Sequence, residues 1–175
     1  MAIDRIINGF YMTPEKNKYF ESATHQLLKN IDSMGLDKFG RLRAKNLVLL
    51  FRDSFRLKSV KYDTFAKDLG EELNRYTYDS DGFCRVASIN FQRMMGKKNW
   101  QLMFIDDNWS YGPHHYLMHT PSKTVFDLTF DQYTHNGIQI PYNIGRQISC
   151  ELEQDDPVVR FAKSIGIENF INQKD

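Results

Sequence analysis

The sequence predicts an α+β fold in which a helical N-terminal half packs on a small antiparallel β-meander. Apolar residues recur at helical spacing up to about residue 80, the hydrophobic period changes to two after Gly96, and turn residues separate the short segments that follow. A chain of 175 residues has the length of one domain. We therefore expect a single domain with a helical part at 1–80, a core at 81–145 and a helical tail at 146–175.

Composition narrows the class of protein. Hydrophobic residues make up 41% of the chain and aromatic residues 14%, which is typical of a folded globular protein. The net charge of +1 predicts neither a nucleic acid nor a membrane as partner. Two cysteines do not form a disulfide framework in a chain of this length, which favours reduced thiols. Residues 1–7 lack the pattern of a secretory signal, so we expect a cytoplasmic protein.

Three helices are expected before residue 80. The first begins at Thr13, a hydroxyl N-cap, followed by Pro14 at the first helical position, and Gly35 ends it. A second helix is expected at 42–55 and a third at 62–76, each with apolar residues at helical spacing.

A basic group accompanies the second helix. Asp53 and apolar residues interrupt it, so we interpret it as a solvated helix face and not as a nucleic-acid patch. Its members are Arg41, Arg43, Lys45, Arg52, Arg56 and Lys58.

A fourth helix starts at Cys84, after a loop that contains Gly82, and ends at Gly96. Its apolar stripe places Cys84 in the first turn on the inward side. Alternating segments then predict strands at 100–105, 114–119, 124–130 and 138–140. Two acids before Pro157 start a final helix.

The order of Cys84, a histidine strand and Asp127 is typical of thiol-dependent acyl transfer. A helix start stabilises a thiolate through the helix dipole. A histidine can accept the thiol proton, and a carboxylate can hold the imidazole in the required tautomer. The competing interpretation is that Cys84 is a small buried hydrophobe.

The residues alone leave the choice of histidine open. Alternation along the strand places His115 and His119 on one face and His114 on the other. If the following loop comprises residues 121–123, Asp127 shares a face with His115. A four-residue loop would place Asp127 beside His114 instead.

A zinc site uses the same residue types, because His114, His115 and His119 with Cys84 or Asp127 could act as ligands. Adjacent histidines on a strand point in opposite directions, and the chain contains no Cys-x-x-Cys or His-Glu-x-x-His spacing. We therefore predict no metal.

Three segments resemble the papain-like and transglutaminase-like cysteine enzymes, and small bacterial and phage proteins of this type most of all. They are Gly-Phe-Cys-Arg-Val-Ala-Ser at 82–88, Pro-His-His-Tyr-Leu at 113–117 and Val-Phe-Asp-Leu-Thr-Phe-Asp-Gln-Tyr at 125–133. The resemblance covers about residues 82–145. Leu128 stands where proline is usual, and Tyr116 where tryptophan is usual.

The resemblance implies a papain-like core with a catalytic triad. Cys84 would be the nucleophile, His115, which directly precedes an aromatic residue, the general base and acid, and Asp127 the residue that orients the imidazole. His114 is the alternative base.

An oxyanion hole would combine the backbone N–H of Cys84 with a side-chain donor, for which Tyr78 and Asn74 are the candidates, and Trp109 could line the cleft. These features predict a thiol hydrolase or acyltransferase, either a cysteine peptidase, a deamidase or a transglutaminase-like enzyme, that acts on a protein or peptide without a cofactor. The alternative function is a non-catalytic binding or structural module, such as a phage or host accessory protein, that retains this fold.

Overall fold

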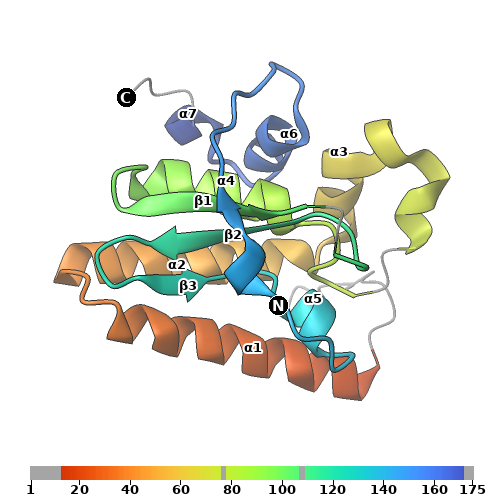
Figure 1. Ribbon diagram of the computed structural model, residues 1–175. Coiled ribbons are helices and arrows are strands. Elements are labelled where there is room, and N and C mark those ends of the chain that lie inside the picture. The colour runs from red at the N-terminus through yellow and green to blue at the C-terminus, as the bar shows by residue number, and fades with distance from the viewer. Residues whose placement is uncertain (1–12, 76–77, 107–108, 172–175) are drawn as a thin grey trace, which may run out of the picture.

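The structure is a computed structural model that describes residues 13–75, 78–106 and 109–171. Segment 1–7 and the predicted helix end at Tyr76 lie outside the described residues. The chain combines helices with a four-stranded antiparallel sheet, which confirms the α+β class (Figure 1).

The first two helices begin with side-chain caps. Helix α1 (Pro14–Ser33) starts as predicted, with the Thr13 hydroxyl accepting a backbone N–H of the first turn. Helix α2 (Lys38–Phe55) begins four residues before the predicted start at residue 42. The reason is Asp37, whose carboxylate accepts a first-turn N–H at 2.6 Å and caps the helix.

The predicted third helix at 62–76 is divided in two. Helix α3 (Lys58–Leu69) is followed by the 3-10 helix η1 (Gly70–Arg75). Gly70 has a φ of 52°, which favours glycine and ends the α-helical geometry there. Helix α4 (Cys84–Met95) agrees with the prediction and ends at Gly96, whose φ is 94°.

The sheet has the strand order β3-β2-β1-β4, and every pair is antiparallel. Its strands are β1 (Trp100–Ile105), β2 (His114–His119), β3 (Thr124–Phe126) and β4 (Arg146–Gln147). The first two match the predicted strands. The order β3-β2-β1 is a meander, as predicted, and β4 adds an edge strand beside β1.

Two strand predictions are wrong. The predicted strand at 124–130 stops after Phe126, because the Asp127 carboxylate accepts the N–H of Thr129 at 2.9 Å and turns the backbone out of the sheet. Residues 138–140 form no strand; Ile140 instead packs its side chain on the outer face of the sheet.

Short helices complete the chain. They are α5 (Asp131–Thr134), the 3-10 helix η2 (Tyr142–Ile144), α6 (Pro157–Ser164) and α7 (Glu168–Ile171). Helix α6 begins at the predicted proline, and Asp156 caps it. Among the described residues, no helix has both the length and the apolarity needed to cross a bilayer.

The main core lies between the sheet and the helices. Helix α4 covers one face of the sheet, with α2 and α6 packed against it and α1 on the outer side of α2 (Figure 1). Trp100 is 1% exposed and belongs to this core. A smaller cluster covers the other face, formed by Met103, Ile105, Tyr116 and Ile140. The start of α4, the start of β2 and the segment after β3 meet at one end of the sheet, where α5 lies.

Candidate active site

Cys84 is the first residue of α4 and is partly exposed. The residue before it, Phe83, is fully buried and stacks on Phe55 with ring centroids 4.5 Å apart, which anchors the helix start. Phe83 supplies no side-chain hydrogen bond to cap the helix. The N-terminal N–H groups of α4 and the positive end of its dipole are therefore directed toward the region of the thiol.

His114 and Asp127 form a buried pair. The Nε2 atom of His114 lies 2.6 Å from Oδ2 of Asp127, and the two residues are 0% and 4% exposed. His119 pairs with Thr124 across the hairpin, so the loop contains the four residues 120–123. That register places Asp127 on the face of His114.

The predicted pairing of Asp127 with His115 is wrong, because the hairpin loop has four residues and not three. His115 lies on the face of β2 that carries Phe104, with ring centroids 4.8 Å apart, and its carbonyl accepts a hydrogen bond from Ser88 at 3.3 Å. Its imidazole also reaches the Cys84 thiol. Both histidines therefore border the sulfur, but only His114 is hydrogen bonded to the buried carboxylate.

Asp127 is saturated with hydrogen bonds. Its Oδ1 accepts the backbone N–H of Thr129 at 2.9 Å and the Thr129 hydroxyl at 3.2 Å. Its Oδ2 accepts the Tyr142 hydroxyl at 2.8 Å in addition to His114. Burial opposes the charged form, but His114 and these donors outweigh it and lower the pKa of Asp127. The carboxylate is thus held ionised beside the imidazole.

The electrostatics of Cys84 and His114 are complementary. Burial raises the pKa of the Cys84 thiol, yet hydrogen bonds with His114 and His115 outweigh it and bring the pKa down to about 5. Burial lowers the pKa of His114, yet Asp127 and the contact with Cys84 raise it to about 10. Between these values the pair is a thiolate and an imidazolium.

The three residues predicted for the oxyanion hole and the cleft differ in where they lie. Tyr78 is fully buried and stacks on His135 with ring centroids 4.1 Å apart, so its ring supports the loop before α4. The Asn74 side chain lies outside what the structure describes. Trp109 is near the site: its ring centroid is 6.2 Å from that of His114 and 4.6 Å from that of Tyr133.

A buried ion pair braces the segment after β3, and the sequence analysis missed it. Arg52 of α2 binds Asp131 through both guanidinium nitrogens, at 2.7 and 2.6 Å, and donates to the Leu128 carbonyl at 3.1 Å. Arg52 is 1% exposed, so its assignment to a solvated helix face is wrong. A signal was present, since Arg52 lies four residues after Val48 and three before Phe55, which is helical spacing on the apolar face.

Gln132 is a second residue that was not predicted as part of the site. Its Oε1 accepts the N–H of Gly82 at 3.4 Å, and its Nε2 lies 3.3 Å from both Nδ1 of His114 and the Thr129 hydroxyl. It therefore joins the loop before Cys84 to the turn after β3. The only signal in the sequence was its position five residues after Asp127, inside the third resembling segment.

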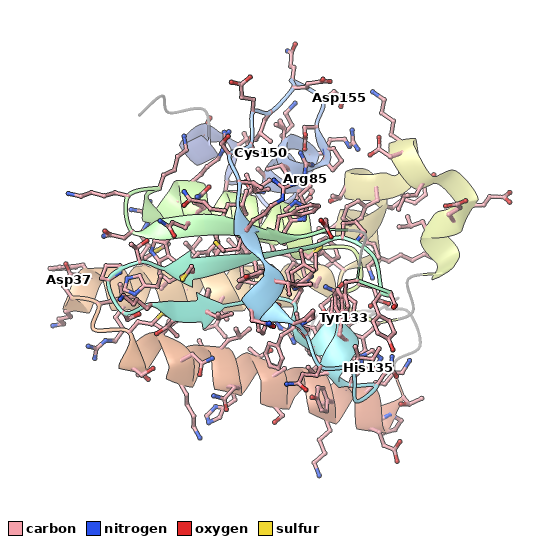
Figure 2. All side chains as sticks on the ribbon, in the orientation of Figure 1. Asp37, Arg85, Tyr133, His135, Cys150 and Asp155 are labelled. Carbon is pink, nitrogen blue, oxygen red and sulfur yellow. The ribbon has the colours of Figure 1, made fainter. Side chains whose placement is uncertain are left out.

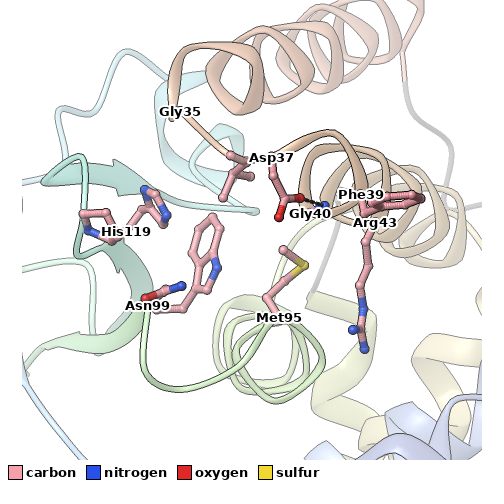
Figure 3. Close-up of a pocket in the computed structure, with 11 residues that line it drawn as sticks. Gly35, Asp37, Phe39, Gly40, Arg43, Met95, Asn99 and His119 are labelled. Carbon is pink, nitrogen blue, oxygen red and sulfur yellow. Dashed lines mark hydrogen bonds between the residues drawn. The ribbon is translucent and has the colours of Figure 1, made fainter.

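The described residues contain no group of three or more side chains placed to hold a metal ion. They do form a cavity of about 410 Å³, lined by Asp37, Arg43, Met95 and His119 among others (Figure 3). Met95 ends α4 and Cys84 begins it, so about 16 Å of helix separates the cavity from the thiol. In Figure 2 Asp37, on the cavity, lies at the left edge, whereas Tyr133, beside His114, lies to the right of the centre.

Comparisons of the chain with family models, with curated proteins and with solved structures found no match. The resemblance to papain-like and transglutaminase-like enzymes therefore stays a prediction from the motifs of residues 82–133.

Proposed function

We propose that this protein is a cysteine-dependent acyl-transfer enzyme that acts on an amide of a protein or peptide. One observation carries the proposal: His114 contacts the buried Asp127 carboxylate on one side and the Cys84 thiol on the other. Because Nε2 faces Asp127, Nδ1 is the ring nitrogen left to exchange a proton with the sulfur. This arrangement supports Cys84 as nucleophile, His114 as base and acid, and Asp127 as the residue that orients the imidazole.

Acylation begins from the thiolate and imidazolium. The sulfur of Cys84 attacks the amide carbonyl carbon, a C–S bond forms, and the carbonyl oxygen takes the negative charge. When the tetrahedral intermediate collapses, the C–N bond breaks and the Nδ1 proton of His114 passes to the leaving amine. The products of this half-reaction are an amine, a thioester on Cys84 and a neutral imidazole.

Deacylation reverses the roles. His114 takes a proton from the incoming nucleophile, which attacks the thioester, and the C–S bond breaks to regenerate the thiolate. Water as nucleophile gives a peptidase or deamidase, and an amine gives a transglutaminase-like reaction. The chemistry of the three side chains is the same in each case.

The start of α4 supports stabilisation of the oxyanion. The backbone N–H of Cys84 lies in the first turn, where helical N–H groups lack intrahelical acceptors. A developing negative charge on the carbonyl oxygen is favoured by such donors and by the helix dipole.

The test is to detect the acyl-enzyme and its turnover. The protein is incubated with p-nitrophenyl esters and with a panel of fluorogenic peptide amides, and adducts are located by intact-protein and peptide mass spectrometry. We expect a transient acyl group on Cys84 and amide turnover that Cys84→Ala abolishes and the matched variant Cys150→Ala retains. A binding module predicts the opposite: no acylation of Cys84, and no effect of Cys84→Ala on the assay.

A further inference from the structure

The side-chain amide of Gln132 contacts both His114 and the loop that leads into Cys84. Its three contacts come from the loop before α4, from β2 and from the turn after β3. The proposed triad assigns it no role.

The orientation of the Gln132 amide is determined at both ends. The backbone N–H of Gly82 can only donate, so the amide oxygen must face it. The Thr129 hydroxyl donates its proton to the Asp127 carboxylate, so it can only accept from Gln132. Both constraints direct the Gln132 NH₂ group toward Thr129 and His114.

In this orientation the Gln132 amide and the Cys84 thiol compete for one atom, Nδ1 of His114. A neutral imidazole that donates from Nε2 to Asp127 has a single lone pair, on Nδ1. The Gln132 NH₂ group can bond to that lone pair at 3.3 Å, and the Cys84 thiol must donate its proton to the same lone pair. Once Nδ1 is protonated, it no longer accepts a hydrogen bond from Gln132.

We propose that Gln132 is a positioning residue that competes with the Cys84 thiol for Nδ1 of His114 and so holds back transfer of the thiol proton. The inference rests on the thiol–imidazole pair of the proposed function and deepens it. Gln132 thereby favours the neutral thiol–imidazole form and narrows the pH range over which the thiolate–imidazolium pair is the stable form.

Other titratable groups also face the pair, and each of them stays in place when Gln132 is changed. Asp127 bonds His114 directly, and the Tyr142 hydroxyl bonds the same carboxylate oxygen. Tyr133 packs edge-on against the His114 ring at 5.0 Å, and the Tyr116 ring lies parallel to it at 6.3 Å. His115 borders the sulfur from β2. A change in the His114 pKa on substitution of Gln132 is therefore attributed to Gln132 and not to these groups.

The experiment measures the effect of Gln132 on the His114 pKa in the absence of the thiol. Ring-nitrogen NMR titrations of His114 are recorded in Cys84→Ala and in Cys84→Ala/Gln132→Met. Loss of the amide removes a hydrogen bond that favours the neutral ring, so we expect the pKa of His114 to rise by roughly half a unit to one unit. With Cys84 present, the thiol loses its proton while His114 is an imidazolium that accepts no bond from Gln132. Gln132→Met should therefore leave the thiol pKa unchanged, as measured by alkylation rate against pH, and raise the upper pKa of the pair, that of the imidazolium.

Gln132→Asn, which is one methylene too short to span Gly82 and His114, should also raise the His114 pKa and keeps a polar side chain. Gln154→Met, at an exposed position, is the matched control and should leave the His114 pKa unchanged. A purely structural role would loosen the contact of His114 with Asp127 and lower the His114 pKa. An unchanged or lowered His114 pKa in both variants overturns the inference, whatever the protein does with amides. Conversely, the expected shifts without acylation of Cys84 support the inference and reject the enzyme.

Discussion

At the scale of single residues, Asp127 determines which nitrogen of His114 carries a permanent proton. Its Oδ2 lies 2.6 Å from Nε2, so the neutral ring keeps its proton there and presents the Nδ1 lone pair to the thiol. Thr129 and Tyr142 hold the carboxylate in place through three further hydrogen bonds. The reactive pair therefore depends on a carboxylate that is itself buried and fully bonded.

Asp127→Asn is expected to abolish most amide turnover while leaving the fold intact. The asparagine amide can present an N–H to Nε2, which favours the tautomer with the proton on Nδ1 and removes the base. In the serine enzymes with an equivalent triad this change costs roughly 10⁴-fold in kcat, and a loss of 10²-fold or more is expected here. Steady-state kinetics measure the loss.

Tyr142→Phe serves as its control, because it removes one neutral donor from the same oxygen and leaves the charge. A net contribution of about 1 kcal/mol for such a bond corresponds to a loss of roughly fivefold. Equal losses in Asp127→Asn and Tyr142→Phe would contradict the role assigned to the carboxylate charge.

At the scale of elements, the β2–β3 hairpin and helix α2 position the triad. The hairpin sets the register that brings Asp127 to His114, and Arg52 of α2 fixes Asp131 a short distance beyond it. Ser80, in the loop before α4, also donates to Asp131 at 3.1 Å. The helical half of the chain therefore contacts the segment after β3 through Arg52 and helps to hold the site in place.

Arg52→Met is expected to destabilise the protein by about 3–5 kcal/mol, because it leaves the buried Asp131 carboxylate without its charge partner. Urea unfolding followed by circular dichroism measures the loss. In the double variant Arg52→Met/Asp131→Leu both charges are gone, so much of the stability should return. If the two single changes and the double change were additive, the ion pair would not be the source of the effect.

The sequence predicted the elements of the site better than their register. Helical periodicity and glycine ends located α4, and alternation located β1 and β2, since those signals are local. A loop of four residues after β2, in place of three, shifts the pairing of the next strand by one residue. That shift moves Asp127 from the face of His115 to the face of His114. Register left the choice between His114 and His115 open, and the resemblance favoured His115 because an aromatic residue follows it; only the tertiary pairing distinguishes them.

At the scale of the whole molecule, one aromatic core joins the helical half to the sheet. Phe51 and Phe55 of α2 contact Phe161 of α6, and Phe91 of α4 packs on both Trp100 and Phe126 of the sheet. Long-range pairs such as Arg52 with Asp131 are invisible to periodicity, because nothing in a local window shows which helix side chain will meet a distant carboxylate. These contacts connect the helices before residue 82, which the resemblance does not cover, to the core of the site.

We therefore expect the helical half and the sheet to unfold together. Far-UV circular dichroism reports the helices, and the fluorescence of Trp100 and Trp109 reports the sheet and the site. The two urea transitions should coincide in midpoint and slope, since the shared core would be disrupted in a single step. Separate transitions would show two independently stable units and would contradict the single core.

The most direct test of the central claim is the rate at which iodoacetamide alkylates Cys84 from about pH 4 to pH 9, with Cys150 as internal reference. The thiolate fraction rises as the pH passes upward through the thiol pKa, which is about 5 for Cys84. Cys84 should therefore react near its maximal rate at pH 6, where an ordinary thiol with a pKa of about 8.5 is almost inert.

His114→Ala should raise the pKa of Cys84 and remove most of its reactivity at pH 6, whereas His115→Ala, at the adjacent position without the carboxylate partner, should remove less of it. If Cys84 instead follows the profile of Cys150 in the unaltered protein, or if His115→Ala removes the reactivity and His114→Ala does not, the Cys84–His114–Asp127 assignment is contradicted.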